Sequence, residues 1–315
     1  MKTIAIIGAG AAGCIATHNL SKLGYAIQVF DKSRGVGGRM ATRRSSAGEF
    51  DHGARFFMSE SAEFRQALSN APVKLWPEAE RQSQRQCFVA TPRQNQLAKF
   101  WLDASPAQLS CKIVELQYTV DGWRLISEQG QNFGPFHGVV SAIPAPQARE
   151  LLANSELAIP EALALVSMDP VWALMFSLEK PLAEATYSDP NPSLSWLGAN
   201  FTKPDRPQTT DSYANVAHAS RQWSRANLED EAAEVAEVML QNLADCIAGF
   251  STPHFASAHR WRFALTKTPL GCSHLALDNH LILAGDWCLG ADVEDAFRSG
   301  TAAALHMHNH LNATR

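Results

Sequence analysis

The stretch IAIIGAGAAG at residues 4–13 decides the fold. Its first four residues form an apolar run of the kind that a buried parallel strand needs, and the glycines after it predict a tight turn into a helix. Gly8 permits the turn, Gly10 lets the backbone approach a pyrophosphate, and Gly13 lets the helix pack closely against the strand. Phosphates would then lie at the helix N-terminus beside Ala11 and Ala12, where free N–H groups favour an anion.

The residues after the glycines complete a strand–helix–strand unit. A helix is predicted from about Ala11 to Leu23, with Gly24 as its C-terminal stop. The next apolar run, at residues 26–30, predicts a second strand that leads to Asp31. That acid lies about 20 residues after the glycines, where a ribose hydroxyl needs an acceptor. Because the glycines, helix, strand and acid occur in this order, the unit predicts a dinucleotide site.

The composition is typical of a globular protein that acts on small molecules. The chain has 315 residues, enough for two domains, because a single core rarely grows past about 250–300 residues. Hydrophobic residues make up 46% and charged residues 18%, which indicates folded cores. The 27 Lys and Arg against 31 Asp and Glu give a net charge of -4, so we expect no general affinity for nucleic acid or for an anionic membrane.

The patterns of cysteine, histidine and apolar residues exclude further classes. The six cysteines are scattered without a C-x-x-C pair, which predicts free thiols and a cytoplasmic protein. No run approaches the ~18 apolar residues of a membrane span, and the strand, turn and helix explain residues 2–20 better than a signal peptide does. His306, His308 and His310 are interpreted as surface histidines, so no metal site is predicted.

A second glycine-rich stretch, DKSRGVGGRMAT, covers residues 31–42. It follows the second strand directly, so Gly37, Gly38 and Arg39 are expected at the same sheet edge as the first glycine loop. A nicotinamide dinucleotide does not need a loop there. The longer, bent FAD does, because its ribityl chain and isoalloxazine ring pass over the sheet and must be enclosed.

These features resemble the flavin amine oxidase superfamily, and more closely its renalase-like branch of FAD-dependent oxidoreductases. The glycine fingerprint, the acid and the GGRMA run carry the resemblance, and DHGARFF at residues 51–57 is similar to the Asp-x-Gly-Ala segment that passes by the flavin. The resemblance implies an α/β fold: a Rossmann-like FAD-binding domain of the amine oxidase / p-hydroxybenzoate hydroxylase type, with a second α+β substrate domain on a mixed or antiparallel sheet.

The composition shifts near residue 168, where we expect the main part of the substrate domain to begin. Strand-like segments broken by Pro, Asn and Asp follow, with one helix predicted from Leu228 to Ala248. We expect a discontinuous FAD-binding domain and a substrate domain, the first made of residues 1–68, 96–165 and 266–315 and the second of residues 69–95 and 166–265.

The end of the chain is expected to return to the cofactor. A buried strand at residues 281–284 leads into Gly285 and Asp286, the usual flavoprotein arrangement in which the acid accepts a ribityl hydroxyl. A helix from Val293 would point its N-terminus at the flavin, although Glu294 in its first turn also suits helix capping. We predict noncovalent FAD, bound by Gly8, Gly10, Ala11, Ala12, Gly13, Asp31, Lys32, Gly38, Arg39, Met40, Gly53, Ala54, Arg55, Phe56, Ile113, Ala142, Gly285, Asp286, Val293, Glu294 and Ala296.

The resemblance also implies an activity. An FAD oxidase of this kind takes a hydride from a small substrate and passes the electrons to O2, which gives H2O2. In the renalase-like branch the substrate is a dihydronicotinamide dinucleotide isomer, and the substrate face would include Arg55, His259, Trp261 and Arg262. Two alternatives stay open: a flavin amine oxidase or desaturase, and a flavin-binding redox sensor without turnover.

Overall fold

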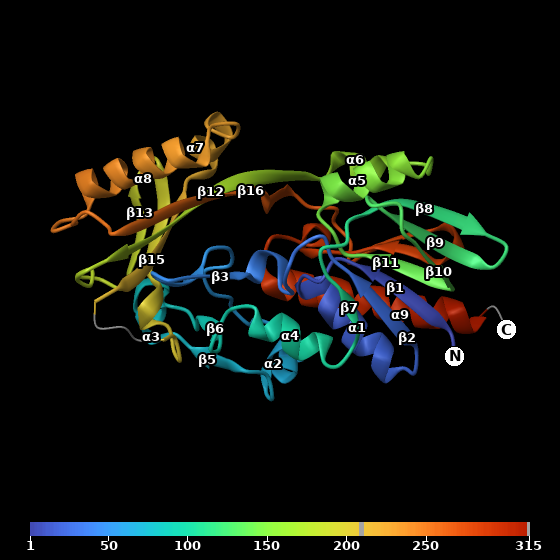
Figure 1. Ribbon diagram of the computed structural model, residues 1–315. Helices are drawn as coiled ribbons and strands as arrows, with labels where there is room; N and C mark the ends of the chain where they lie inside the picture. Colours follow the sequence, from blue (N-terminus) through green and yellow to red (C-terminus); the bar gives the residue numbers. More distant parts are fainter. Residues whose placement is uncertain (208–210, 314–315) are drawn as a thin grey trace.

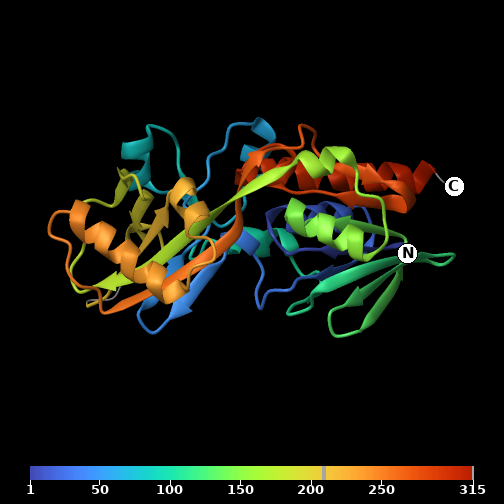
Figure 2. The same ribbon diagram turned by 90° about the horizontal axis from the view of Figure 1, so that it is seen from above.

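The computed structural model describes residues 1–207 and 211–313, which form two lobes (Figure 1). One lobe is built on a six-stranded, mostly parallel sheet and the other on a five-stranded antiparallel sheet. Two long strands, β12 (Ser167–Leu178) and β16 (Phe255–Thr268), run from one lobe into the other, as the view from above also shows (Figure 2).

The six-stranded sheet confirms the strand–helix–strand unit predicted from the first residues. Its order is β17-β18-β11-β1-β2-β7, and every neighbouring pair is parallel except β17 with β18. Its strands are β1 (Thr3–Ile7), β2 (Ala26–Phe30), β7 (Ala107–Gln108), β11 (Gly138–Ser141), β17 (Leu275–Leu277) and β18 (Leu281–Leu283).

Both faces of this sheet are covered, as the apolar run in β1 predicts. Ile4 and Ile6 pack into one hydrophobic cluster and Ala5 and Ile7 into another, because successive side chains of a strand point to opposite faces. The second cluster is completed by an antiparallel three-stranded sheet and two helices: β8 (Ile113–Thr119), β9 (Gly122–Ser127), β10 (Asn132–Phe136), α5 (Ala145–Asn154) and α6 (Glu161–Leu165).

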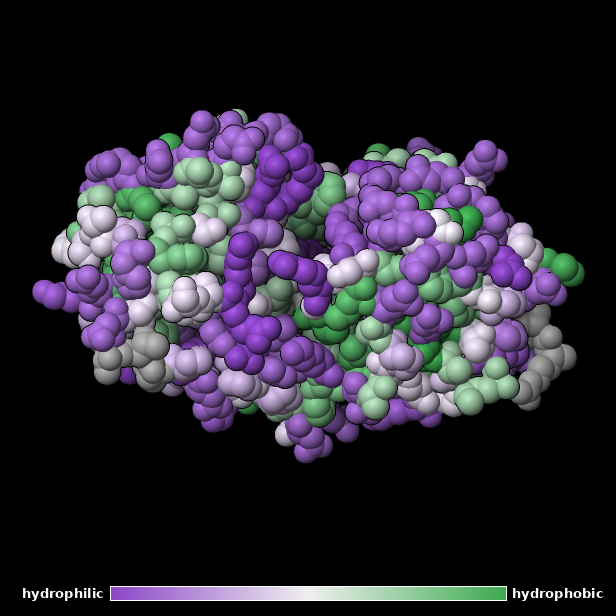
Figure 3. All heavy atoms as spheres, in the orientation of Figure 1, coloured by the Kyte–Doolittle hydropathy of each residue, from purple (hydrophilic) through white to green (hydrophobic). Residues whose placement is uncertain are grey.

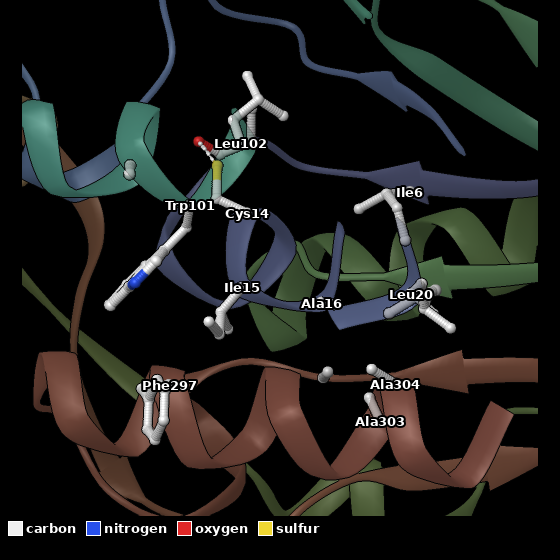
Figure 4. Packing of buried hydrophobic residues seen from close by; sticks show 14 of the residues in the cluster. Ile6, Cys14, Ile15, Ala16, Leu20, Trp101, Leu102, Phe297, Ala303 and Ala304 are labelled. Atoms are coloured by element: carbon white, nitrogen blue, oxygen red, sulfur yellow. Dashed lines mark hydrogen bonds between the residues drawn. The ribbon is translucent and has the colours of Figure 1, made fainter. Parts of the chain in front are cut away.

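The first face is covered by α1 (Ala11–Lys22) and α9 (Val293–Ala313), the start and the end of the chain (Figure 4). In that view Ile15 of α1 and Phe297 of α9 belong to the same apolar cluster. The two helices approach closely because a Cβ at Gly300 would lie 2.3 Å from the carbonyl oxygen of Ala12. This contact places the N-terminus of α9 near that of α1.

The second lobe is antiparallel throughout, in the order β13-β14-β15-β12-β16. Its other strands are β13 (Thr186–Asn191), β14 (Leu194–Ala199) and β15 (Tyr213–Ala219). The helix predicted at residues 228–248 is confirmed as α8 (Ala232–Cys246), which begins four residues later and ends two residues earlier than predicted. A short helix that the sequence did not predict, α7 (Arg221–Ala226), precedes α8, and in the segment between them the Leu228 carbonyl accepts a hydrogen bond from Arg260 Nη1 (2.6 Å).

The remaining elements are short helices and strands outside the two main sheets. They are η1 (Gly38–Met40), β3 (Thr42–Ser45), β4 (Gly48–Asp51), α2 (Ala62–Leu68), β5 (Val73–Leu75), α3 (Pro77–Ser83), β6 (Phe88–Ala90), α4 (Gln96–Leu102), η2 (Asn200–Thr202), η3 (Asp278–His280) and η4 (Asp286–Cys288). Among the described residues, no helix is both long enough and apolar enough to cross a membrane.

Candidate functional site

A large cleft lies between the two lobes, and residues of both lobes line it. Its volume is about 1980 Å³, well above the roughly 300–1,000 Å³ of an ordinary small-molecule site. The space-filling view shows a notch between the lobes with hydrophilic side chains beside it (Figure 3). The cleft therefore has room for a long dinucleotide and for a second small molecule.

The glycine turn after β1 opens into this cleft and fits a phosphate. Gly10 precedes α1 with no side-chain cap, and a Cβ placed on it would meet no atom within 4 Å. Gly8 has a φ of +104° and lies against the turn after β11, since its Cβ would come within 2.9 Å of the Ala142 carbonyl oxygen. Uncapped helical N–H groups beside open space are the donor set that a pyrophosphate needs.

The second glycine stretch and the segment after β4 lie against this turn. Gly37 N donates to the Ala9 carbonyl (2.9 Å), and a Cβ on Gly38 would lie 3.2 Å from the Cα of Gly10. Ala54 N donates to the Arg39 carbonyl (2.8 Å), and a Cβ on Gly53 would fall 1.9 Å from the same oxygen. The expectation that these glycine loops share one edge of the sheet is confirmed.

Asp31 is buried at the end of β2 and lines the cleft. Its two carboxylate oxygens accept hydrogen bonds from Ala9 N and Ser33 N, both at 2.7 Å, and each oxygen keeps a further lone pair for a ligand hydroxyl. Close by, Asn95 also lines the cleft, and its Oδ1 is a buried acceptor with no partner among the described residues. No motif in the sequence marks Asn95, which lies behind Gly37.

Asp286 follows β18 and is held across the cleft by Arg39. Arg39 Nη1 donates to Asp286 Oδ2 (2.8 Å) and to the Ala264 carbonyl (3.0 Å), and Arg39 Nη2 donates to Asp286 Oδ1. The sequence predicts a ribityl hydroxyl as the partner of Asp286, and the structure adds an arginine from the second glycine stretch. This ion pair joins two segments that the sequence predicts to bind FAD.

Nearly all of the residues predicted to bind FAD line the cleft, and two do not. Gly13 lies behind the turn, where a Cβ would fall 1.9 Å from the Gly8 carbonyl oxygen. Glu294 faces away, and its carboxylate accepts hydrogen bonds from Glu60 N (2.7 Å) and Ser61 N (2.9 Å). The role of Glu294 in this structure is therefore to fix the segment before α2.

Of the predicted substrate-face residues, His259 and Trp261 meet at the second-lobe end of the cleft, together with His52, which the sequence did not single out, whereas the Arg262 guanidinium pairs with the exposed Glu229. The ring centroids of His52, His259 and Trp261 lie 4.5–5.0 Å from one another, and Trp261 Nε1 donates to the His52 carbonyl (2.8 Å). Burial lowers the pKa of His52 to about 4 and also lowers the pKa of His259. Both imidazoles are therefore neutral at pH 7.

A buried ion cluster is centred on Asp51, the residue directly before His52. Lys203 Nζ (3.0 Å) and Arg206 Nη2 (2.6 Å) both donate to Asp51 Oδ2, and Thr42 Oγ1 donates to Oδ1 (2.6 Å). The three charged side chains are at most 1% exposed. Burial alone would raise the pKa of Asp51, but the two cations hold it well below its usual range. The cluster fixes β4 directly before the residues that pass along the cleft.

Other candidate groups lie outside this arrangement. Cys288 belongs to the hydrophobic cluster that contains Trp287 and does not line the cleft, and burial raises the pKa of its thiol to about 12. The rings of His306 and His310 stack with centroids 4.1 Å apart. Within the described part of the chain, no group of three or more His, Cys, Asp or Glu residues could hold a metal ion.

Comparison with known families assigns the class. Residues 6–70 match the NAD(P)-binding Rossmann-like domain, and residues 94–308 match the flavin containing amine oxidoreductases. The second match alone spans more than half of the chain. The protein belongs to the family of flavin containing amine oxidoreductases and is an FAD-dependent oxidoreductase, which confirms the predicted class and cofactor.

Solved structures share the fold over nearly the whole chain. Cyclohexylamine oxidase from Brevibacterium oxydans IH-35A has a TM-score of 0.72 at 14% sequence identity, covering 99% of each chain. A redesigned triple mutant of putrescine oxidase has a TM-score of 0.74 at 12% identity, covering 98% of this chain and 99% of that chain. Wild-type putrescine oxidase bound to putrescine has a TM-score of 0.70 at 13% sequence identity, covering 97% of this chain and 98% of that chain. At these identities the likeness establishes the fold alone.

Proposed function

We propose that the protein is a renalase-like oxidase that takes a hydride from an anionic dihydronicotinamide dinucleotide isomer and releases ordinary NAD(P)+. The chemistry that bound FAD supplies is acceptance of the hydride and transfer of its two electrons, with two protons, to O2 as H2O2. In this proposal the lobe with the parallel sheet is the FAD-binding domain, and the antiparallel lobe is the substrate domain. The contribution of the chain is to bind both molecules, to orient the donor carbon and to exclude water.

The observation that carries the proposal is the charge of the cleft. Among the described residues that line it, twelve are Lys or Arg and five are Asp or Glu, although the whole chain has a net charge of -4. The pyrophosphate of FAD accounts for two negative charges, which leaves an excess of cations. Such a cleft attracts phosphate groups and repels ammonium groups.

Several of these cations are free to meet a ligand. In the described part of the chain, no carboxylate oxygen lies within the 4.0 Å ion-pair distance of six cleft residues: Lys32, Arg34, Arg43, Arg44, Arg55 and Lys99. A dinucleotide can therefore bind to them without breaking an existing ion pair. Arg260 and Arg262, by contrast, share the exposed Glu229.

The wall of His52, His259 and Trp261 supports a planar, uncharged reacting group. Two neutral imidazoles and an indole offer flat, polarisable surfaces and edges that a nicotinamide ring can pack against. None of the three supplies the negative charge that an ammonium group would require. We assign these residues to orienting the donor ring and excluding water from it.

Oxidation of an amine is the second candidate, and the family assignment favours it. Alkyl amines resemble the lysine side chain, whose pKa is about 10.4, so they enter a binding site mostly as cations. The excess of Lys and Arg in the cleft opposes that entry. The charge of the substrate therefore separates the two candidates.

The test is anaerobic stopped-flow reduction of the purified flavoprotein by three kinds of donor. We expect 2- or 6-dihydronicotinamide dinucleotides to bleach the flavin rapidly, and we expect their second-order rate constant to fall as salt is added, because added ions screen the attraction. Cyclohexylamine and putrescine should leave the flavin oxidised. Bleaching by the amines alone, or no bleaching by any donor, contradicts the proposed function.

A further inference from the structure

Arg55 lines the cleft, and its guanidinium contacts several side chains of the second lobe. It lies two residues after Gly53, and its side chain reaches the antiparallel sheet of the second lobe. Its Nε donates to His218 Nδ1 (3.1 Å), its Nη2 donates to Ser195 Oγ (2.9 Å), and its guanidinium lies 5.2 Å from the ring centroid of Trp196. All three partners are uncharged, so this environment positions the guanidinium without neutralising it.

The tautomer of His218 fixes this arrangement. Arg55 Nε can only donate, so His218 Nδ1 accepts, and His218 Nε2 must carry the proton that it donates to the His52 carbonyl (3.3 Å). Burial, followed by the charge of Arg55, holds the pKa of His218 well below its usual range. The same His52 carbonyl accepts from Trp261 Nε1, so one network orients Arg55 and the aromatic wall.

No carboxylate in the described structure is in contact with the Arg55 guanidinium. Its burial lowers its pKa to about 10, with Asp189 raising the pKa and Arg221 lowering it, so the side chain stays charged at pH 7. Neither Asp189 nor any other described carboxylate lies within the 4.0 Å ion-pair distance of it. A mostly buried guanidinium has five N–H donors, of which two are used here, and leaving the others without an anion costs free energy.

We propose that Arg55 binds a phosphate group of the substrate and is a specificity-determining residue of the oxidase, with His218 as its positioning residue. The inference rests on the proposed function for the identity of the phosphate donor. The FAD phosphates are accounted for separately by the uncapped N-terminus of α1, which belongs to the other lobe. A planar guanidinium with free N–H groups can bind phosphate oxygens in a bidentate manner, whereas a lysine at the same place provides only a point charge.

The test measures binding to the oxidised holoenzyme through the flavin difference spectrum, with three probes: NAD+, inorganic pyrophosphate and nicotinamide. In Arg55→Gln we expect the Kd of NAD+ and of pyrophosphate to rise about tenfold or more, because hydrogen bonds to a charged group are lost. The Kd of nicotinamide, which carries no phosphate, should stay unchanged. Arg55→Lys should fall between the wild type and Arg55→Gln for NAD+.

The matched control is Arg124→Gln, on β9 and outside the lining of the cleft, which should bind all three probes as the wild type does. Flavin content and Tm of each variant show whether it is folded. Unchanged binding of NAD+ and pyrophosphate to Arg55→Gln, or an equal loss for nicotinamide, overturns the inference. Since these are binding measurements with pyrophosphate included, they decide the role of Arg55 even where dihydronicotinamides fail to reduce the wild-type flavin.

Discussion

Replacing Asp51 by alanine is expected to destabilise the folded protein by about 3–5 kcal/mol, the usual result of removing one partner from a buried ion pair. The side chains of Lys203 and Arg206 are 1% exposed, and both donate to the same carboxylate oxygen. Without Asp51, Lys203 and Arg206 would remain buried and would lose the carboxylate that they share. The free energy of unfolding from urea titration, followed by tryptophan fluorescence, measures the loss.

Asp205→Asn is the control, because Asp205 pairs with Lys74 on the surface, where ion pairs contribute about 0–1 kcal/mol. Acidification gives a second readout. Since the pKa of Asp51 is lower in the folded state, its contribution is present above the unfolded value of about 3.9 and is lost as the pH falls toward the folded value. An Asp51→Ala protein as stable as Asp205→Asn would show that the buried ion cluster does not stabilise the fold at the end of β4.

Replacing Gly10 by valine is expected to weaken FAD binding by about two orders of magnitude while leaving the apoprotein folded. The backbone of Gly10 has φ -79° and ψ -175°, which a β-branched residue adopts readily, and its Cβ would meet no protein atom within 4 Å. The added methyl groups would instead occupy the space beside the α1 N-terminus and separate a phosphate from the N–H donors. Titration of the apoprotein with FAD, followed by flavin fluorescence, gives the Kd.

Gly13→Ala is the contrasting variant. Its Cβ would fall 1.9 Å from the Gly8 carbonyl oxygen, so it should lower the Tm of the apoprotein itself. If Gly10→Val bound FAD as tightly as the wild type, the phosphates would not lie at this turn. If both variants lowered the Tm equally, the structure's open space beside Gly10 would be contradicted.

The parts of the fold that sequence predicts are those with local signals. β1, α1 and β2 occupy nearly the predicted residues because their apolar runs and glycines are contiguous, and the turn requires glycine at Gly8. The helix predicted at residues 228–248 exists as α8 but begins at Ala232, and the Leu228 carbonyl before it bonds to Arg260, which lies 32 residues further along the chain. Apolar spacing carries no information about such a partner.

In the site, too, residues with local sequence signals could be predicted, and residues that depend on distant partners could not. The glycine loops and Asp286 follow buried strands in recognisable order, so they could be found before the structure was known. Arg55 and His218 are separated by 163 residues, and Asp51 and Arg206 by 155. Asp51 and Arg55 belong to a segment that the resemblance singles out, but their partners Arg206 and His218 look like ordinary residues in their own segments. Only the packing of the second lobe against β4 makes one pair a candidate anion site and the other a structural ion cluster.

The most direct test of the central claim, that one cleft built from the glycine loops and the C-terminal segment holds FAD noncovalently, is the release of the flavin on denaturation. We expect the native protein to be yellow and, after acid precipitation, about one FAD per chain to appear in the supernatant and be identified by chromatography. Protein that stays colourless after incubation with excess FAD, or flavin that remains attached to the precipitated chain, would contradict the account.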